Sequence, residues 1–269
     1  MGKKILLIGC GNLGKILLTK WENNNLRVDV VEKNKRKVVS LKKTFDKLNF
    51  FYKLDDIKFE KYDFVVLCVK PNVSKSLLRE TAKFINNKNI VISMIAGLKI
   101  KNIMSYFPDK NIILRAMPNI FSYVESSATG LFCKIKINEE ERKKIEFIFY
   151  KLGVVYWMKK EDHMNFFTAL FGGGPAYFFF FLKTIIDISK NNGFSVKDSK
   201  ELVFSLLRGT HDFLNKNNEN LESLISKVTS KGGTTEEAIN YFKKDKIFSK
   251  IFQTAILKAE EKSKYLSNN

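Results

Sequence analysis

The sequence has 269 residues, of which 45% are hydrophobic and 28% are charged. This length favours one or two domains, and the composition is that of a soluble globular protein rather than a disordered chain. No apolar run approaches the roughly 18–20 residues of a membrane span. Residues 1–5 lead into a strand pattern without a small-residue cleavage site, so we expect neither a membrane segment nor a signal peptide. Three widely spaced cysteines (Cys10, Cys68 and Cys133) fit neither a disulfide framework nor a zinc site, which favours a cytoplasmic protein.

The formal net charge of +19 allows a nucleic-acid partner, a membrane surface or an anionic substrate. The lysines are spread over predicted helix faces, and the densest cluster lies at residues 33–43. No nucleic-acid-binding module is recognisable. We therefore interpret most lysines as solvated surface residues and predict neither a nucleic-acid nor a membrane partner.

Short apolar runs alternate with amphipathic stretches in the first part of the chain. The runs predict strands at residues 5–8, 28–31, 64–69, 90–95 and 112–116, and the stretches predict helices at 13–21, around Val38 and Leu41, and at 74–85. Such alternation predicts βαβ units and a parallel sheet with right-handed crossovers. Continuous apolar strands indicate a sheet that is covered on both faces.

After residue 157 the strand signals stop. Helices are predicted at residues 175–191, 196–215, 221–228 and 235–266. The charged stretch 158–162 marks a boundary between an α/β domain (1–160) and an all-α domain (161–269). The second domain is small and very apolar, so we expect it to bury a face against a second copy of itself.

A G-x-G-x-x-G motif, Gly9-Cys10-Gly11-Asn12-Leu13-Gly14, follows the first strand and opens a helix. In a dinucleotide site the first glycine allows the tight turn, the second lets the pyrophosphate approach the backbone, and the third lets helix and strand pack closely. The preceding strand, the following helix and the acidic Glu32 after the second strand complete the pattern. We therefore predict dinucleotide binding; a tight turn in an α/β protein without a nucleotide is the alternative.

Glu32 and the basic residues after it give conflicting indications about the dinucleotide. A carboxylate at this place would bind the ribose 2′-OH of NAD and repel a 2′-phosphate. Lys33, Lys35 and Arg36 could instead hold the 2′-phosphate of NADP, or could simply form a solvated helix start. The choice between NAD and NADP stays open.

Two proline-terminated strands end in further candidate cofactor residues, Val69-Lys70-Pro71 and Asn119 after Pro118. Ligands of open α/β sheets bind at the carboxyl ends of the strands. On spacing alone, simple strand termination is the stronger interpretation of both segments.

Two glycine-rich segments begin helices in the second domain, residues 171–177 and 228–235. The first places Pro175 at the first position of a long helix. The second could hold a small carboxylate on its backbone N–H groups and hydroxyls, although a helix–helix turn with a Thr cap is the stronger interpretation. His163 and His211 stand far apart without clustered carboxylates or cysteines, so we predict no metal site.

These motifs together resemble pyrroline-5-carboxylate reductases. Five blocks carry the resemblance in the same order over nearly the whole chain: residues 8–14, 68–71 with 95–97, 115–119, 168–177, and 229–235 with Ala238-Ile239. The resemblance implies a Rossmann-type dinucleotide-binding domain, followed by a helical domain that interlocks with its partner into a homodimer. It also implies an active site between the nicotinamide and the helical domain. There Ser230, Gly232, Gly233, Thr234 and Thr235 would bind the substrate carboxylate.

The implied activity is NAD(P)H-dependent reduction of 1-pyrroline-5-carboxylate to L-proline, the last step of proline biosynthesis. Thr235 is the candidate proton donor, with a bound water as the alternative. The chain departs from the family at Phe171 and Gly173 (usually serine), Asn165 (usually aspartate), and Phe121 and Lys231 (usually proline). Phe171 and Lys231 flank the implied substrate pocket. Two alternatives follow: a related imine or β-hydroxyacid reductase, for which Lys183 is the candidate acid, or a cofactor-binding homologue without activity.

Overall fold

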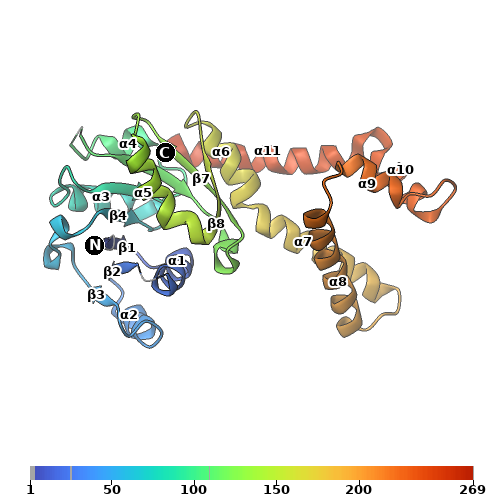
Figure 1. Ribbon diagram of the computed structural model, residues 1–269, viewed down its shortest axis with the longest axis horizontal. Coiled ribbons are helices and arrows are strands. Elements are labelled where there is room, and N and C mark those ends of the chain that lie inside the picture. Colours follow the sequence, from blue (N-terminus) through green and yellow to red (C-terminus); the bar gives the residue numbers. More distant parts are fainter. Residues whose placement is uncertain (1–3, 25, 109, 269) are drawn as a thin grey trace. The chain divides into compact units, whose positions relative to one another are not determined.

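The computed structural model describes residues 4–24, 26–108 and 110–268 (Figure 1). Most of the N-terminal segment considered for a signal peptide therefore lies outside the described residues. Contacts divide the chain into two compact units, and each is described by itself. The first unit comprises Met1–Pro175 together with Lys258–Asn269, and the second comprises Ala176–Leu257. This division differs from the boundary expected after residue 160, which stays a prediction.

The first unit is built on an eight-stranded sheet with the order β3-β2-β1-β4-β5-β6-β7-β8 among the described residues. The strands are β1 (Lys4–Ile8), β2 (Arg27–Val31), β3 (Asn49–Phe51), β4 (Phe64–Leu67), β5 (Ile90–Ser93), β6 (Ile113–Met117), β7 (Ser127–Cys133) and β8 (Gly153–Trp157). All neighbouring pairs within β1 to β6 are parallel, as predicted. The carboxyl ends of β1, β4, β5 and β6 therefore lie in a row at one edge of the sheet.

The continuous apolar strands are buried on both faces, as their pattern predicts. Ile5 and Leu7 of β1 pack into one apolar cluster, and Leu6 and Ile8 pack into another. Helices α1 (Asn12–Asn23), α2 (Lys35–Lys42) and α5 (Glu139–Phe149) contribute to the first cluster, and α3 (Ser74–Ala82), α4 (Ile100–Met104) and α6 (His163–Phe167) contribute to the second. The sheet is therefore a middle layer between two layers of helices, with the core on both sides.

The sheet extends beyond the predicted parallel strands by β7 and β8, which the sequence pattern does not predict. Strand β7 is antiparallel to β6, while β8 is parallel to β7. The link from Met117 to Ser127 contains only a short turn of 3₁₀-helix, Ile120–Val124. A parallel pair requires a crossover of about a dozen residues or more, so this short link allows only an antiparallel pair.

The second unit is helical. Its helices are α7 (Gly174–Asn191), α8 (Val196–Lys216), α9 (Leu221–Lys227), α10 (Thr234–Lys243) and α11 (Ile247–Asn268); α7 begins in the first unit and α11 ends in it. The prediction of one continuous helix over residues 235–266 is wrong. The chain breaks at Asp245 and Lys246, whose φ angles of 50° and 56° are left-handed and incompatible with a right-handed helix.

Large apolar side chains remain exposed on the second unit. On α7 and α8 they include Phe178, Phe179, Phe180, Phe181, Leu202, Phe204 and Leu206. The helical stretch His163–Asn191 is also long and apolar enough to cross a membrane by length and composition. Unbroken apolar runs in the sequence do not predict this, because Lys183 breaks the apolar run that ends at Leu182. The mean hydropathy of the longer stretch stays high in spite of that one lysine. An apolar surface of this extent marks a contact with another protein surface or with lipid.

Candidate active site

The glycine loop has the close contacts that its motif requires. Gly9 follows β1 with a φ of +87°, and a Cβ atom there would lie 2.4 Å from Val69 Cγ1 and 2.7 Å from the carbonyl oxygen of Cys68. Gly14 is buried in α1, and a Cβ atom there would lie 3.0 Å from the carbonyl oxygen of Gly9. Both positions therefore exclude larger side chains for reasons of packing. The Gly9 contact also joins the loop to the strand end at Val69.

Gly11 is different because no described atom beyond its own chain neighbours lies within 4 Å of the place where its Cβ would stand. It is the N-cap of α1, and no side chain caps this helix end. The N–H groups of Asn12 and Leu13 therefore remain open to an external acceptor at the positive end of the helix dipole. This cradle of backbone donors with an open Cβ position fits a pyrophosphate.

Glu32, directly after β2, is hydrogen-bonded to that loop. Its carboxylate accepts from the backbone N–H of Cys10 (3.2 Å), the backbone N–H of Asn34 (3.0 Å) and Nζ of Lys37 (3.0 Å). Burial would raise the pKa of Glu32, but these hydrogen bonds outweigh it and hold the pKa below its ordinary value. Glu32 is therefore an anion beside the glycine loop, where it can accept hydrogen bonds from ribose hydroxyls.

The predicted basic residues lie around the start of α2. Lys33 Nζ forms an ion pair with Glu80 at 2.9 Å, so its charge is already partly balanced. Lys35 and Arg36 are exposed in the first turn of α2, and the structure records no ion pair for them among the described residues. From the sequence, all three residues could hold a 2′-phosphate or could form a solvated helix start; in the structure, Lys33 is paired and Lys35 and Arg36 have no recorded ion pair among the described residues.

The two proline-terminated strands end at the same edge of the sheet as the glycine loop. Val69 contacts Gly9, and Lys70 and Pro71 follow β4 at the surface. The side chain of Asn119, after β6, accepts from the backbone N–H of Phe121 (2.9 Å) and donates to the carbonyl oxygen of Phe171 (2.9 Å). Asn119 is therefore a cap and an anchor in the structure, and it is only 8% exposed.

The glycine-rich segment before α10 forms a tight turn. Gly232 has a φ of +74°, and the N–H of Gly233 donates to the carbonyl oxygen of Ser230 at 2.9 Å. The N–H of Gly232 donates to the side chain of Glu236 at 2.7 Å. Two of the three backbone donors predicted to bind a carboxylate thus have internal acceptors, one of which is itself a carboxylate. Thr234 and Thr235 are exposed in the first turn of α10.

Several other candidate groups have defined surroundings. Lys183, the acid of the alternative enzyme, forms an ion pair with Asp187 on the same helix face. Burial raises the pKa of Cys10 to about 11 and that of Cys68 to about 12, so both thiols are protonated near neutral pH. No group of three or more potential metal ligands is found within the described ranges.

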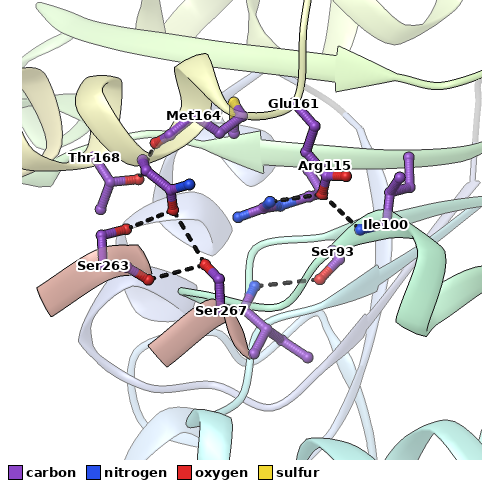
Figure 2. A network of polar contacts seen from close by, with 10 residues as sticks. Ser93, Ile100, Arg115, Glu161, Met164, Thr168, Ser263 and Ser267 are labelled. Atoms are coloured by element: carbon purple, nitrogen blue, oxygen red, sulfur yellow. Dashed lines mark hydrogen bonds and ion pairs between the residues drawn. The ribbon is translucent and has the colours of Figure 1, made fainter. Parts of the chain in front are cut away.

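Sequence reasoning missed a buried polar network beside the row of strand ends (Figure 2). Glu161 Oε1 accepts from Arg115 Nη1 of β6 at 2.7 Å and from the backbone N–H of Ile100 at 2.6 Å. In the same network, Asn165 Oδ1 accepts from the hydroxyls of Ser263 and Ser267 on α11. A buried Arg115 could have indicated a carboxylate partner, but nothing in the spacing identifies Glu161, which is 46 residues away.

Two family models match separate parts of the chain. Residues 4–97 match the model described as NADP oxidoreductase, coenzyme F420-dependent. Residues 161–266 match the model described as pyrroline-5-carboxylate reductase dimerisation. The first match covers the glycine loop and Glu32, and the second covers the helices with the exposed apolar side chains. The fold is therefore a Rossmann-type dinucleotide-binding unit followed by a helical dimerisation domain, as predicted.

Similarity to known proteins extends over nearly the whole chain. Pyrroline-5-carboxylate reductases of Staphylococcus saprophyticus and Aquifex aeolicus are each 28% identical to it, covering 98% of this chain and 98% and 97% of their own lengths. The crystal structure of Plasmodium falciparum pyrroline carboxylate reductase with NADP bound has a TM-score of 0.86 and 25% identity, covering 98% of both chains. The Coxiella burnetii pyrroline-5-carboxylate reductase structure has a TM-score of 0.86 and 26% identity, covering 99% of both chains. These comparisons confirm the resemblance to the pyrroline-5-carboxylate reductase family from the glycine loop to the dimerisation domain.

Proposed function

We propose that this protein catalyses the NAD(P)H-dependent reduction of 1-pyrroline-5-carboxylate to L-proline, the last step of proline biosynthesis. One observation carries the proposal: a dinucleotide cradle, in which Gly9 packs on Val69 and Glu32 binds the same loop, occurs in one chain with the dimerisation domain of these reductases. The curated relatives that bear this name match both parts together.

The residues present fit a reduced nicotinamide dinucleotide. The loop residues Gly9, Gly11, Asn12, Leu13 and Gly14 would hold the pyrophosphate on backbone N–H groups, and Glu32 would bind the ribose hydroxyls. Lys33, Lys35 and Arg36 are candidates for a 2′-phosphate, and Val69, Lys70, Pro71 and Asn119 would border the rest of the cofactor. When bound, the cofactor supplies the hydride from C4 of its nicotinamide.

The loop before α10 would hold the substrate carboxylate. Backbone N–H groups of Gly232, Gly233 and Thr234, with the hydroxyls of Ser230 and Thr235, form a set of donors at the start of a ten-residue helix. Two of these donors are already bonded within the loop. For them to bind the substrate, Glu236 must release the N–H of Gly232 and the carbonyl oxygen of Ser230 must release the N–H of Gly233. Thr235, or a water that it holds, is the proposed proton donor.

The proposed reaction does not require a strong acid or base from the protein. A cyclic imine can be protonated near neutral pH, and its iminium form is already a strong electrophile. The residues must hold two reactants in contact, and orientation of that kind can lower a barrier by roughly 7–11 kcal/mol. A site without an obvious catalytic His or Asp is adequate for this reaction.

The helical domain makes the protein a homo-oligomer, and we propose a homodimer in which the exposed apolar faces of α7 and α8 are buried against the partner. This accounts for the apolar stretch His163–Asn191 without a lipid contact. We propose a cytoplasmic enzyme with a small imino acid as substrate, without nucleic-acid or membrane partners.

The test is an assay of the purified full chain with 1-pyrroline-5-carboxylate and either NADPH or NADH. The loss of reduced-cofactor absorbance measures the rate, and the proline formed is quantified separately. We expect proline in stoichiometric amount with cofactor oxidised. Cofactor binding by a folded dimer without turnover would indicate the inactive homologue instead. Turnover of other imines or β-hydroxyacids only would indicate a related reductase.

A further inference from the structure

The last two turns of α11 belong to the nucleotide-binding unit and contact its helix α6 (Figure 2). Asn165 Oδ1 accepts from the hydroxyl of Ser263 at 3.0 Å and from that of Ser267 at 3.1 Å. The Ser267 hydroxyl shares its single proton between Asn165 Oδ1 and the carbonyl oxygen of Ser263, which lies 2.9 Å away and one turn earlier in the helix. Asn165 is 4% exposed, Ser263 8% and Ser267 3%, so this is a buried polar contact.

A second contact between the same helix end and the sheet is steric. Gly97, in the loop after β5, has a φ of +73°. A Cβ atom at Gly97 would lie 2.9 Å from Leu266 Cβ and 3.0 Å from the Leu266 carbonyl carbon. The backbone of the β5–α4 loop therefore rests directly on the backbone of α11, with no room for a side chain at Gly97.

Both contacts end at the edge of the sheet where the cofactor is proposed to bind. Strand β5 lies between β4, which is followed by Val69, and β6, which is followed by Asn119. Helix α6 continues into a π-helical turn, Thr168–Gly172, and the carbonyl oxygen of Phe171 there accepts from Asn119. The C-terminal turns thus connect to the β5–α4 loop through Gly97 and to Asn119 through α6 and the π-helical turn.

The hydrogen bonds of this contact allow only one relative position of α11 and α6. Burying polar groups costs free energy unless they are hydrogen-bonded, and an apolar interface of the same size would allow the helix to slide. Two hydroxyls that converge on one amide oxygen fix both the rotation and the register of α11 against α6. Such a contact sets the position of neighbouring backbone more sharply than packing alone.

We propose that Ser263, Leu266 and Ser267 are positioning residues for hydride transfer, which act by fixing the β5–α4 loop and the π-helical turn at the cofactor edge. The inference rests on the proposed function, and it assigns a role in the reaction to the C-terminal turns of the chain. These residues need not touch the cofactor or the substrate.

The principal test is the double variant S263A/S267A in the full-length chain, with Asn165 intact. We expect kcat to fall by about tenfold, because a misplacement of about 1 Å can cost on the order of 100-fold in rate. The affinity for NADPH, measured by fluorescence titration, should change by less than about twofold, since the glycine loop is untouched. The primary isotope effect on kcat with cofactor deuterated at the transferred position should increase, because hydride transfer becomes more rate-limiting.

A matched control and a conservative variant separate positioning from simple stability. Ser199→Ala removes a fully buried hydroxyl that donates to Ser189 in the helical unit, and it should leave kcat and the isotope effect unchanged. Asn165→Asp keeps an oxygen acceptor for both serines and should retain most of kcat, whereas Asn165→Leu should behave like the double variant. Should the double variant not fold, each serine is replaced singly and the same readouts apply.

A lower melting temperature with unchanged kcat and isotope effect in the folded double variant would overturn the proposal. The wild-type assay is judged separately: absence of turnover there would overturn the proposed function. In that case hydrogen exchange at the backbone amides of residues 95–98 decides the inference. Faster exchange in the double variant than in Ser199→Ala would support it, and equal exchange would overturn it.

Discussion

Lys37 Nζ lies 3.0 Å from Glu32 Oε2, so the carboxylate at the end of β2 has a cation of its own five residues later. The same carboxylate accepts from the backbone of the glycine loop at Cys10, which holds it beside the nucleotide cradle. Its pKa is lowered, and it is therefore charged throughout the neutral range. The ribose of a bound cofactor would therefore lie beside a charged carboxylate that is already paired with Lys37.

We predict that NADH is used at least as well as NADPH. The carboxylate of Glu32 can accept from ribose hydroxyls and repels a 2′-phosphate, while Lys33 is already paired with Glu80. Values of kcat/KM for the two cofactors at saturating imine measure the preference. A strong preference for NADPH would mean that Lys35 and Arg36 dominate the site.

The same contact predicts the effect of neutralising the carboxylate. Glu32→Gln should shift the ratio of kcat/KM values about tenfold toward NADPH, which corresponds to about 1.4 kcal/mol. Arg36→Ala should shift the ratio in the opposite direction, because it removes a candidate phosphate ligand. An unchanged ratio in both variants would show that the 2′ position is recognised elsewhere.

Two glycines of one loop should fail in different ways when changed to alanine. Gly9→Ala would place a methyl group 2.4 Å from Val69 Cγ1 in a left-handed backbone conformation, so the protein should lose several kcal/mol of stability. Gly11→Ala meets no described atom within 4 Å, so its melting temperature should stay close to that of the wild type. It should nevertheless weaken cofactor binding by at least about tenfold, because the methyl group blocks the pyrophosphate. Equal cofactor affinity in Gly11→Ala would contradict the assignment of the cradle.

Much of the first unit could be predicted because its strands are buried on both faces. A short apolar run such as Ile5–Ile8, ended by the glycine motif, indicates a strand buried on both faces, and the same motif orients the helix that follows. Strand β8 was missed because Val154 and Tyr156 are exposed, which removes the apolar signal. Strand β3 is only three residues long, too short for a periodic pattern.

The candidate site was predictable where local backbone geometry decides it and not where distant residues meet. Gly9, Gly11 and Gly14 follow from one motif, and the structure supplies the contacts that explain them. The pairing of Lys33 with Glu80, 47 residues away, and of Asn165 with Ser263, 98 residues away, depends on tertiary packing. No spacing rule connects such residues in a single sequence.

Asp29 should make the first unit sensitive to acid. Its buried carboxylate accepts from Tyr62 Oη (2.6 Å), Asn49 Nδ2 (2.9 Å) and Lys4 Nζ (2.9 Å). Burial would raise the pKa of Asp29, but these partners outweigh it and lower the pKa. A lowered folded pKa gives stability that is present above the unfolded pKa and is lost as pH falls through the folded pKa. Asp29→Asn should therefore cost about 1–3 kcal/mol at pH 7, and the difference from wild type in urea unfolding should shrink in acid. A constant difference at all pH values would contradict the role of the charge.

Phe180 on α7 is 72% exposed and should lie in the proposed dimer interface. Phe180→Glu would bury a charge there, so sedimentation should show a monomer where the wild type is a dimer. Asn87→Glu, an exposed position in the first unit, is the control for added charge and should leave the dimer intact. A dimeric Phe180→Glu protein would place the interface on another face.

Glu236 should weaken substrate binding in the wild-type protein. Its carboxylate accepts from the N–H of Gly232 at 2.7 Å, so it occupies one of the donors proposed for the substrate carboxylate and adds a like charge beside it. Glu236→Ala should lower the KM for 1-pyrroline-5-carboxylate by roughly threefold to tenfold with little change in kcat, since one hydrogen bond to a charged group is worth about 1.5–3 kcal/mol before the loop reorganises. Glu237→Ala removes the same charge from the next residue, which is exposed, and should change KM far less. A higher KM in Glu236→Ala alone would mean that this contact shapes the loop for the substrate instead of competing with it.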